Sequence, residues 1–324
     1  MTIKVKLTDE RTTFKPFAYP WCYDAWLEHE QSHWLHTEIP MADDVRDWET
    51  RLTVEEKNFL THIFRFFTQG DIDVAGAYVD KYLPVFPQPE VRMMLLGFAA
   101  REALHIAAYS HLIETLGMPE TTYSEFMEYD AMKDKHEYVE KFSETTEHSI
   151  AQQMAVFSAF TEGMQLFSSF VMLLNFQRHG KMKGMGQIIA WSLRDETMHF
   201  ESMITLFKTF IKENRKIWKD DLKMELYQIA RDMVDLEDKF IDLAFSMGGI
   251  EGLTPDEVKE YIRYITDRRL ISLGLKGNFG VKKNPLPWVE EMINAPSHTN
   301  FFENKSTDYG KGATTGSWAE VWAQ

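Results

Sequence analysis

Apolar residues recur every three to four positions along most of this chain, which is the spacing of one face of an α-helix. No stretch alternates between apolar and polar residues over the length of a useful β-strand, and no repeat has solenoid spacing. The pattern predicts an all-α protein whose core is a bundle of long helices. The predicted helices span residues 53–84, 89–117, 150–178, 186–214, 221–247 and 254–275.

The two ends of the chain lack this pattern. Residues 1–52 are irregular and rich in aromatic residues, and we expect them to wrap around the outside of the bundle. Residues 297–324 are poor in apolar residues until Trp318 and Trp322, which predicts a flexible tail with an apolar end. We therefore expect one helical domain over residues 1–296, followed by the tail.

The segment from Met154 to Leu174 is apolar enough to resemble a membrane span. Its one charged residue, Glu162, lies near the middle, where an ionised side chain would cost about 2.5–3.5 kcal/mol in a bilayer. We therefore interpret the segment as the central helix of a soluble bundle, in which Glu162 is a buried carboxylate.

Composition narrows the function further. The chain has 324 residues with a formal net charge of −15, which argues against binding to nucleic acid or to an anionic membrane. The single cysteine, Cys22, excludes an intramolecular disulfide and a thiolate zinc site. The N-terminal sequence has no apolar signal-peptide core, so we expect a cytoplasmic protein.

The motif Glu-x-x-His occurs three times. The copy Glu30/His33 lies in a polar stretch and is interpreted as a solvated face. The other two copies lie in strongly apolar helices, where an unpaired ionised carboxylate would be very costly. The i, i+3 spacing places each carboxylate and imidazole on one helix face, where they could bind the same ion. These two copies are Glu102/His105 and Glu196/His199.

Two such helices, with one further carboxylate from each of two others, make the ligand set of a ferritin-like di-metal site. Glu162 and Asp71 are available for this purpose. Asp73 is an alternative to Asp71, but it is displaced by about 200° around the helix axis, so only one can face the core. Four carboxylates balance two divalent ions, and mainly oxygen ligands favour iron or manganese over zinc or copper. The alternative is a set of buried ion pairs without metal.

Tyr109 lies one turn beyond His105 on the same helix face. It is either a core tyrosine with a hydrogen-bonded hydroxyl or, beside a site that activates oxygen, a one-electron donor. The spacing alone leaves both alternatives open.

With these residues in place, the chain resembles the radical-generating small subunit of class I ribonucleotide reductase along essentially its whole length. The runs "SLRDETMHF", "RRLISLGL" and "NPLPWVEEMINAPSHTNFFENKSTDY" are similar to motifs of that family. The family's order of metal ligands is matched by Asp71, Glu102, His105, Glu162, Glu196 and His199.

The resemblance implies roles for residues beyond the ligands. Tyr109 matches the position of the tyrosyl radical. Trp34 matches the tryptophan that begins electron transfer, linked through Asp195 to the ligand His105. Tyr309, in the tail, matches the tyrosine that passes the oxidising equivalent to the large subunit.

The sequence departs from the family pattern beside the radical position. Of two phenylalanines expected after the glutamate of the third ligand helix, Phe170 is kept and the other is Leu166. The departure bears on the lifetime of the radical, because this pocket would surround it.

The resemblance also implies an activity shared between chains. We expect a homodimer with two metal ions per chain, as an Fe/Fe pair or as Mn/Mn or Mn/Fe, which reacts with dioxygen or superoxide. A large catalytic subunit, docked by the tail, would then reduce ribonucleotides to deoxyribonucleotides. Substrate chemistry must lie on that partner, because this chain has only Cys22 and no phosphate-binding loop. Some manganese-using members store the oxidising equivalent in a mixed-valent metal pair.

Two other functions fit a di-metal bundle. One is a stand-alone oxidase or hydroxylase, which would be active without a partner. The other is ferritin-type metal storage, which would require a cage and many ions per chain.

Overall fold

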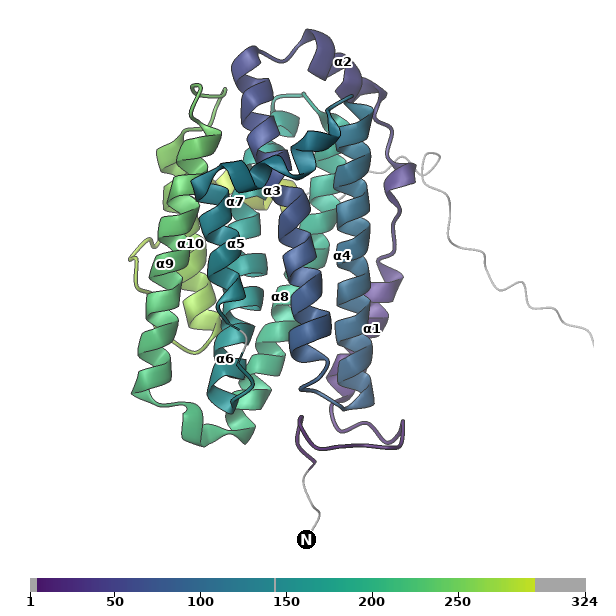
Figure 1. The fold of residues 1–324 in the computed structure, drawn as a ribbon, viewed down its shortest axis with the longest axis vertical. Coiled ribbons are helices and arrows are strands. Elements are labelled where there is room, and N and C mark those ends of the chain that lie inside the picture. The colour runs from purple at the N-terminus through teal and green to yellow at the C-terminus, as the bar shows by residue number, and fades with distance from the viewer. Residues whose placement is uncertain (1–4, 143, 295–324) are drawn as a thin grey trace, which may run out of the picture.

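The computed structural model describes residues 5–142 and 144–294 and shows a bundle of helices (Figure 1). No β-strand is present in these ranges, so the predicted all-α fold is confirmed. The α-helices are α1 (Pro20–Gln31), α2 (Ala42–Thr50), α3 (Val54–Gly76), α4 (Pro89–Thr115), α5 (Asp130–Glu140), α6 (Glu147–Met154), α7 (Leu166–Arg178), α8 (Lys183–Glu213), α9 (Asp220–Ala244), α10 (Pro255–Ser272) and α11 (Pro287–Asn294).

Two π-helical segments extend these helices. Segment η2 (Ala77–Tyr82) continues α3, and η5 (Ala155–Gln165) joins α6 to α7 in one continuous rod. All eleven residues of η5 are buried. Residues 147–178 are long and apolar enough to cross a membrane by length and composition, yet their most apolar window is 100% buried inside the bundle. The interpretation of this segment as a central core helix is therefore confirmed.

Local chemistry explains where the long helices begin. Thr53 and Thr254 each accept a hydrogen bond from a backbone N–H three residues on, and the glutamate at that position bonds back to the threonine N–H. Helix α4 begins at Pro89. Proline has no backbone N–H, but an N–H in the first turn of a helix has no acceptor within the helix, so no hydrogen bond is lost.

The expectation for residues 1–52 is wrong in part. Much of this segment is helical, as α1 and α2, and it reaches the core rather than only covering it. Cys22 and Trp34 are fully or almost fully buried. Helix α1 packs along α4 at the edge of the bundle opposite α9 (Figure 1). The sequence also gave no indication of α5 or α11.

Candidate metal centre

The six candidate ligands meet in the middle of the bundle. They come from four neighbouring segments, α3, α4, η5 and α8, and each is no more than 1% exposed. Their ligand atoms form two overlapping groups that share one glutamate. The first group contains Asp71, Glu102 and His105, and the second contains Glu102, Glu162, Glu196 and His199.

Each histidine turns its Nδ1 atom toward the carboxylates. His105 Nδ1 lies 3.2 Å from Glu102, 3.1 Å from Glu196 and 4.0 Å from Asp71. The two imidazoles therefore present the same atom to the shared space between the helices.

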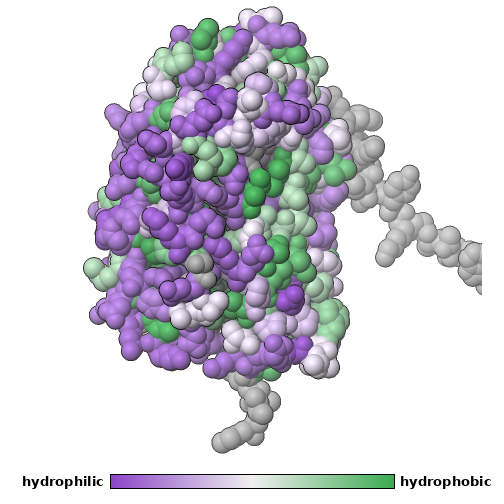
Figure 2. Space-filling model, in the orientation of Figure 1, coloured by the Kyte–Doolittle hydropathy of each residue, from purple (hydrophilic) through white to green (hydrophobic). Residues whose placement is uncertain are grey.

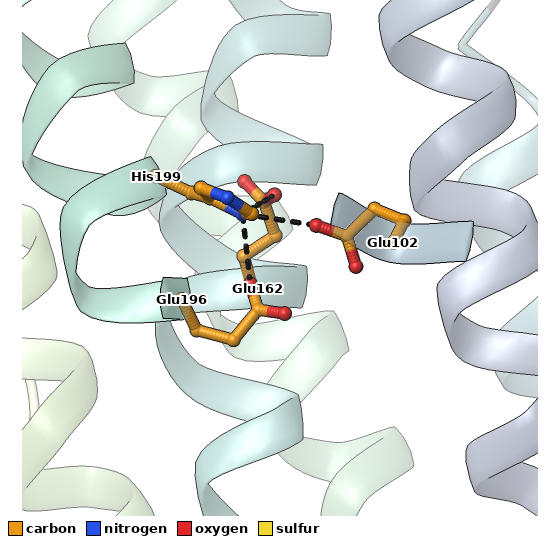
Figure 3. Close-up of side chains that lie close together, drawn as sticks. All are labelled: Glu102, Glu162, Glu196 and His199. Carbon is orange, nitrogen blue, oxygen red and sulfur yellow. Dashed lines mark ion pairs between the residues drawn. The ribbon is translucent and has the colours of Figure 1, made fainter. Parts of the chain in front are cut away.

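Figure 3 shows the second group, with the His199 ring directed at three carboxylates. His199 Nδ1 lies 2.9 Å from Glu102, 3.5 Å from Glu196 and 3.7 Å from Glu162. Glu102 reaches both histidines, one with each oxygen, and would therefore help to hold a metal ion in either group.

The chemistry of this donor set fits two cations. Both oxygens of Asp71 and of Glu196 are buried and accept no hydrogen bond from the described residues. One oxygen of Glu102 and one of Glu162 are likewise buried and accept no hydrogen bond from these residues. Carboxylate oxygens left unpaired in this way are very costly in a dry core, and two divalent ions would offset the charge of the four acids.

The pKa values of the clustered carboxyl groups also indicate a site for cations. Burial raises the pKa of Asp71 well above its usual range, and the charge of Glu102 raises it further. Burial likewise raises the pKa of Glu162 to about 8. Burial also acts against ionisation of Glu102, but the charges of His105 and His199 lower its pKa to about 2. Asp71 and Glu162, whose pKa values are raised, would therefore be ionised more readily if further positive charge entered the cluster.

The other candidate acid on α3 lies elsewhere. Asp73 accepts a hydrogen bond from Gln69 at 2.6 Å and pairs with His136 at 2.7 Å, away from the cluster. Asp71 is therefore the aspartate that faces the core. Glu30 and His33 are exposed, as the sequence predicted.

A hydrogen-bond network centred on Asp195 contacts His105 at Nε2, the ring nitrogen that points away from the cluster. Asp195 Oδ2 accepts hydrogen bonds from Trp34 Nε1 at 2.7 Å and from Arg101 at 2.9 Å. The same oxygen lies 3.2 Å from His105 Nε2. Arg194 contacts the other oxygen at 3.2 Å. The Trp34 and His105 rings are stacked with their centroids 6.0 Å apart. The structure thus brings together the three residues that the resemblance linked.

The sequence did not indicate two polar contacts of the ligands. Tyr78 donates a hydrogen bond to Glu162 at 2.5 Å, and His29 Nε2 lies 3.1 Å from His199 Nε2. Tyr78 lies seven residues after Asp71, on the same helix face, and this spacing was the available signal. His29 lies seven residues after the buried Cys22, which marks the inner face of α1.

Tyr109 lies in the same core, on the α4 face that carries Glu102 and His105. It is 3% exposed, and its ring contacts Phe67 edge to face at 4.4 Å. Phe67 in turn contacts Phe170 at 5.4 Å, and the substituted position Leu166 is also buried. Burial raises the pKa of Tyr109 well above its usual value, and the charge of Asp71 raises it further. The phenol is therefore protonated and shielded from water.

The tail residues lie outside the described part of the chain. These are Tyr309 and the predicted docking segment 297–324, so their roles stay predictions.

The four helical segments and their carboxylate and histidine side chains define the class of ferritin-like di-metal carboxylate proteins. A family model described as "Ribonucleotide reductase, small chain" matches residues 11–285. The chain belongs to this family, whose members are oxidoreductase subunits that act with a large subunit.

Individual relatives agree. The chain is 57% identical to a probable ribonucleoside-diphosphate reductase small subunit of Invertebrate iridescent virus 3, covering 97% of this chain and 88% of the relative. It is 30% identical to the ribonucleoside-diphosphate reductase subunit beta of Chlamydia pneumoniae, covering 91% and 88%.

Solved structures share the fold. The ribonucleotide reductase R2 subunit from Clostridium botulinum has a TM-score of 0.82 at 23% identity, over 89% of this chain and 94% of that one. A dimanganese(II)-NrdF from Streptococcus sanguinis has a TM-score of 0.76 at 20% identity, over 88% and 99%.

Proposed function

We propose that this subunit holds two iron or manganese ions, stores an oxidising equivalent as a radical on Tyr109, and delivers it to a large subunit through Trp34 and Tyr309. The observation that carries the proposal is the continuous hydrogen-bonded connection from Trp34 through Asp195 to His105, next to the buried cluster of acids. A storage or stand-alone oxidase function gives no reason to connect a buried tryptophan to a ligand.

The metal pair would be held by Asp71, Glu102, His105, Glu162, Glu196 and His199. When bound and reduced, it would supply one-electron oxidation with dioxygen or superoxide. The protein side chains have separate tasks around it. The aromatic and aliphatic residues beside Tyr109 exclude water, which would otherwise quench a radical. Asp195 keeps the proton of His105 on Nε2 and leaves Nδ1 free to bind metal.

Transfer out of the site would begin at Trp34. Its indole N–H is bonded to the same carboxylate oxygen that faces His105, so an electron and a proton could move over short, fixed contacts. Arg101 neutralises Asp195 at 2.9 Å and holds it in place.

Homodimerisation is part of the proposal. Helices α3 and α4 present apolar side chains to solvent, including Ile72, Leu96 and the alanines Ala100 and Ala103. Figure 2 shows apolar side chains gathered along this face. A second copy of the chain is the occupant we assign to it, because an uncovered apolar surface of this kind is typical of a subunit interface.

The radical assignment is tested by electron paramagnetic resonance on the metal-loaded protein exposed to dioxygen. The wild type is expected to show an organic radical signal that Tyr109→Phe removes, with metal content unchanged. Tyr123→Phe serves as the control, because its hydroxyl contacts Ser110 at 2.8 Å, outside the cluster. The same organic signal in Tyr109→Phe would show that another residue carries the radical.

The partner assignment is tested by truncation after Ser297. The shortened chain is expected to bind metal and form the radical, because the cluster lies wholly in the helical part. It is expected to lose ribonucleotide reduction when mixed with the large subunit. Full activity of the truncated chain would remove the tail from the mechanism.

A further inference from the structure

The two candidate histidine ligands are supported by different groups. Each imidazole points Nδ1 into the cluster and Nε2 away from it. What lies behind Nε2 fixes the ring orientation and the position of its proton. The inference below concerns this outer contact and rests on the proposed di-metal centre.

Behind His105 stands a charged acceptor. Its Nε2 faces the Asp195 carboxylate at 3.2 Å, and that carboxylate is also bound by Arg101 and Trp34. This arrangement belongs to the relay already described.

Behind His199 stands a second imidazole. His199 Nε2 and His29 Nε2 are 3.1 Å apart, and both residues are no more than 1% exposed. Two facing ring nitrogens can share only one proton. Because His199 needs a bare Nδ1 to bind metal, its proton lies on Nε2 and is donated to His29. His29 is therefore a neutral acceptor with its own proton on Nδ1, which is buried and has no hydrogen-bond partner among the described residues.

The position of His29 is itself fixed. Arg101 donates from one nitrogen to the backbone oxygen of His29 at 3.0 Å and from another to that of Ser32 at 3.1 Å. The His29 ring also packs against Phe98, with centroids 5.1 Å apart. Helix α1 thus holds an acceptor in the core at the height of the metal site, although it lies at the edge of the bundle.

We propose that His29 is a positioning residue for the metal ion bound by His199, and that it does not serve the ion bound by His105. Loss of this acceptor would leave a buried N–H unpaired and free the His199 ring to rotate. The affinity for one of the two ions should then fall, while the affinity for the other is retained.

The test titrates metal-free, full-length protein with Mn(II) and follows free Mn(II) by electron paramagnetic resonance. The wild type is expected to bind two ions per chain. His29→Ala is expected to weaken one of them by about 10–100-fold, the usual effect of removing the outer partner of a ligand. His29→Gln should restore most of the affinity, because its amide oxygen can accept the same proton.

His33→Ala is the matched control, since His33 lies four residues away and is exposed. If His29→Ala does not fold, His29→Leu gives the same comparison with the core filled. Unchanged affinity for both ions, or equal loss of both, would overturn the proposal. So would a His29→Gln protein as weak as His29→Ala. Fewer than two ions bound by the wild type would instead overturn the di-metal centre on which the proposal rests.

Discussion

Gly163 shows how a missing side chain positions a ligand. It follows Glu162 in the π-helical segment η5, and a Cβ atom there would lie 2.9 Å from the Phe200 ring and 3.1 Å from the Ser158 carbonyl oxygen. Arg269 also uses the space, donating to the Gly163 carbonyl at 2.6 Å. The close approach of α8 and α10 to η5 therefore depends on glycine at this position.

Gly163→Ala is expected to lower the free energy of unfolding by about 1–3 kcal/mol, because a backbone oxygen cannot move aside as a flexible side chain can. The backbone adjustment that makes room for the alanine methyl group should also displace Glu162 and weaken metal binding. Thermal denaturation and Mn(II) titration would measure the two effects. Gly249→Ala is the control, because no atom of the described residues lies within 4 Å of the added Cβ. Equal stability of the two variants would contradict the argument.

The chemistry of single residues explains what the sequence could predict of the site. Acids in apolar helices have few explanations other than a cation, so the candidate ligands could be recognised together. The contacts of His29 and Tyr78 with the candidate ligands could not be predicted, because a neutral polar residue in a helix has many ordinary explanations. Arg101 precedes Glu102 in the sequence, but its ion pair with Asp195 could be found only from the folded structure.

At the scale of elements, a buried ion pair joins α5 to α9. Lys135 Nζ lies 2.6 Å from Glu237, and Ser168 of α7 donates a hydrogen bond to the same carboxylate. The ammonium also lies over the rings of Phe66 and Phe240, at 4.1 and 4.3 Å from their centroids. Burial lowers the pKa of Lys135 and raises that of Glu237, and their mutual contact opposes both shifts and so favours the charged forms.

Lys135→Ala is expected to destabilise the protein by about 3–5 kcal/mol, because it leaves a buried carboxylate without its counter-charge. Replacing both partners by apolar residues, as Lys135→Met with Glu237→Leu, should cost far less. Urea denaturation of the three proteins would measure this. A double variant no more stable than Lys135→Ala would show that packing, not charge, is responsible.

Helix α5 is an element that the sequence pattern did not predict. The six long helices have apolar faces that repeat over many turns, and the structure places their ends within a few residues of the prediction. Helix α5 has eleven residues, and one of its three buried side chains is Lys135. The inner face of α5 therefore does not look apolar in the sequence. The burial of Lys135 is explained only by its ion pair with Glu237 on α9.

At the scale of the whole molecule, the apolar face of α3 and α4 is the dimer interface that we propose. Ala103 lies on that face and is exposed in the single chain. Ala103→Glu should place a charge in the proposed interface and convert the dimer to monomers, as measured by sedimentation. Met224→Glu, at a residue that is 62% exposed on α9, is the control. A dimeric Ala103→Glu protein would place the interface elsewhere.

The depth of the candidate ligands has a consequence for how the proposed metal ions would be acquired. Because each candidate ligand is no more than 1% exposed, an ion would reach the cluster only after the surrounding side chains or helices move apart. Exchange should then be slow once the bundle has closed, and the bound metal would be selected by supply at the moment of loading rather than by equilibrium afterwards. Metal content would thus record the conditions under which each molecule was assembled.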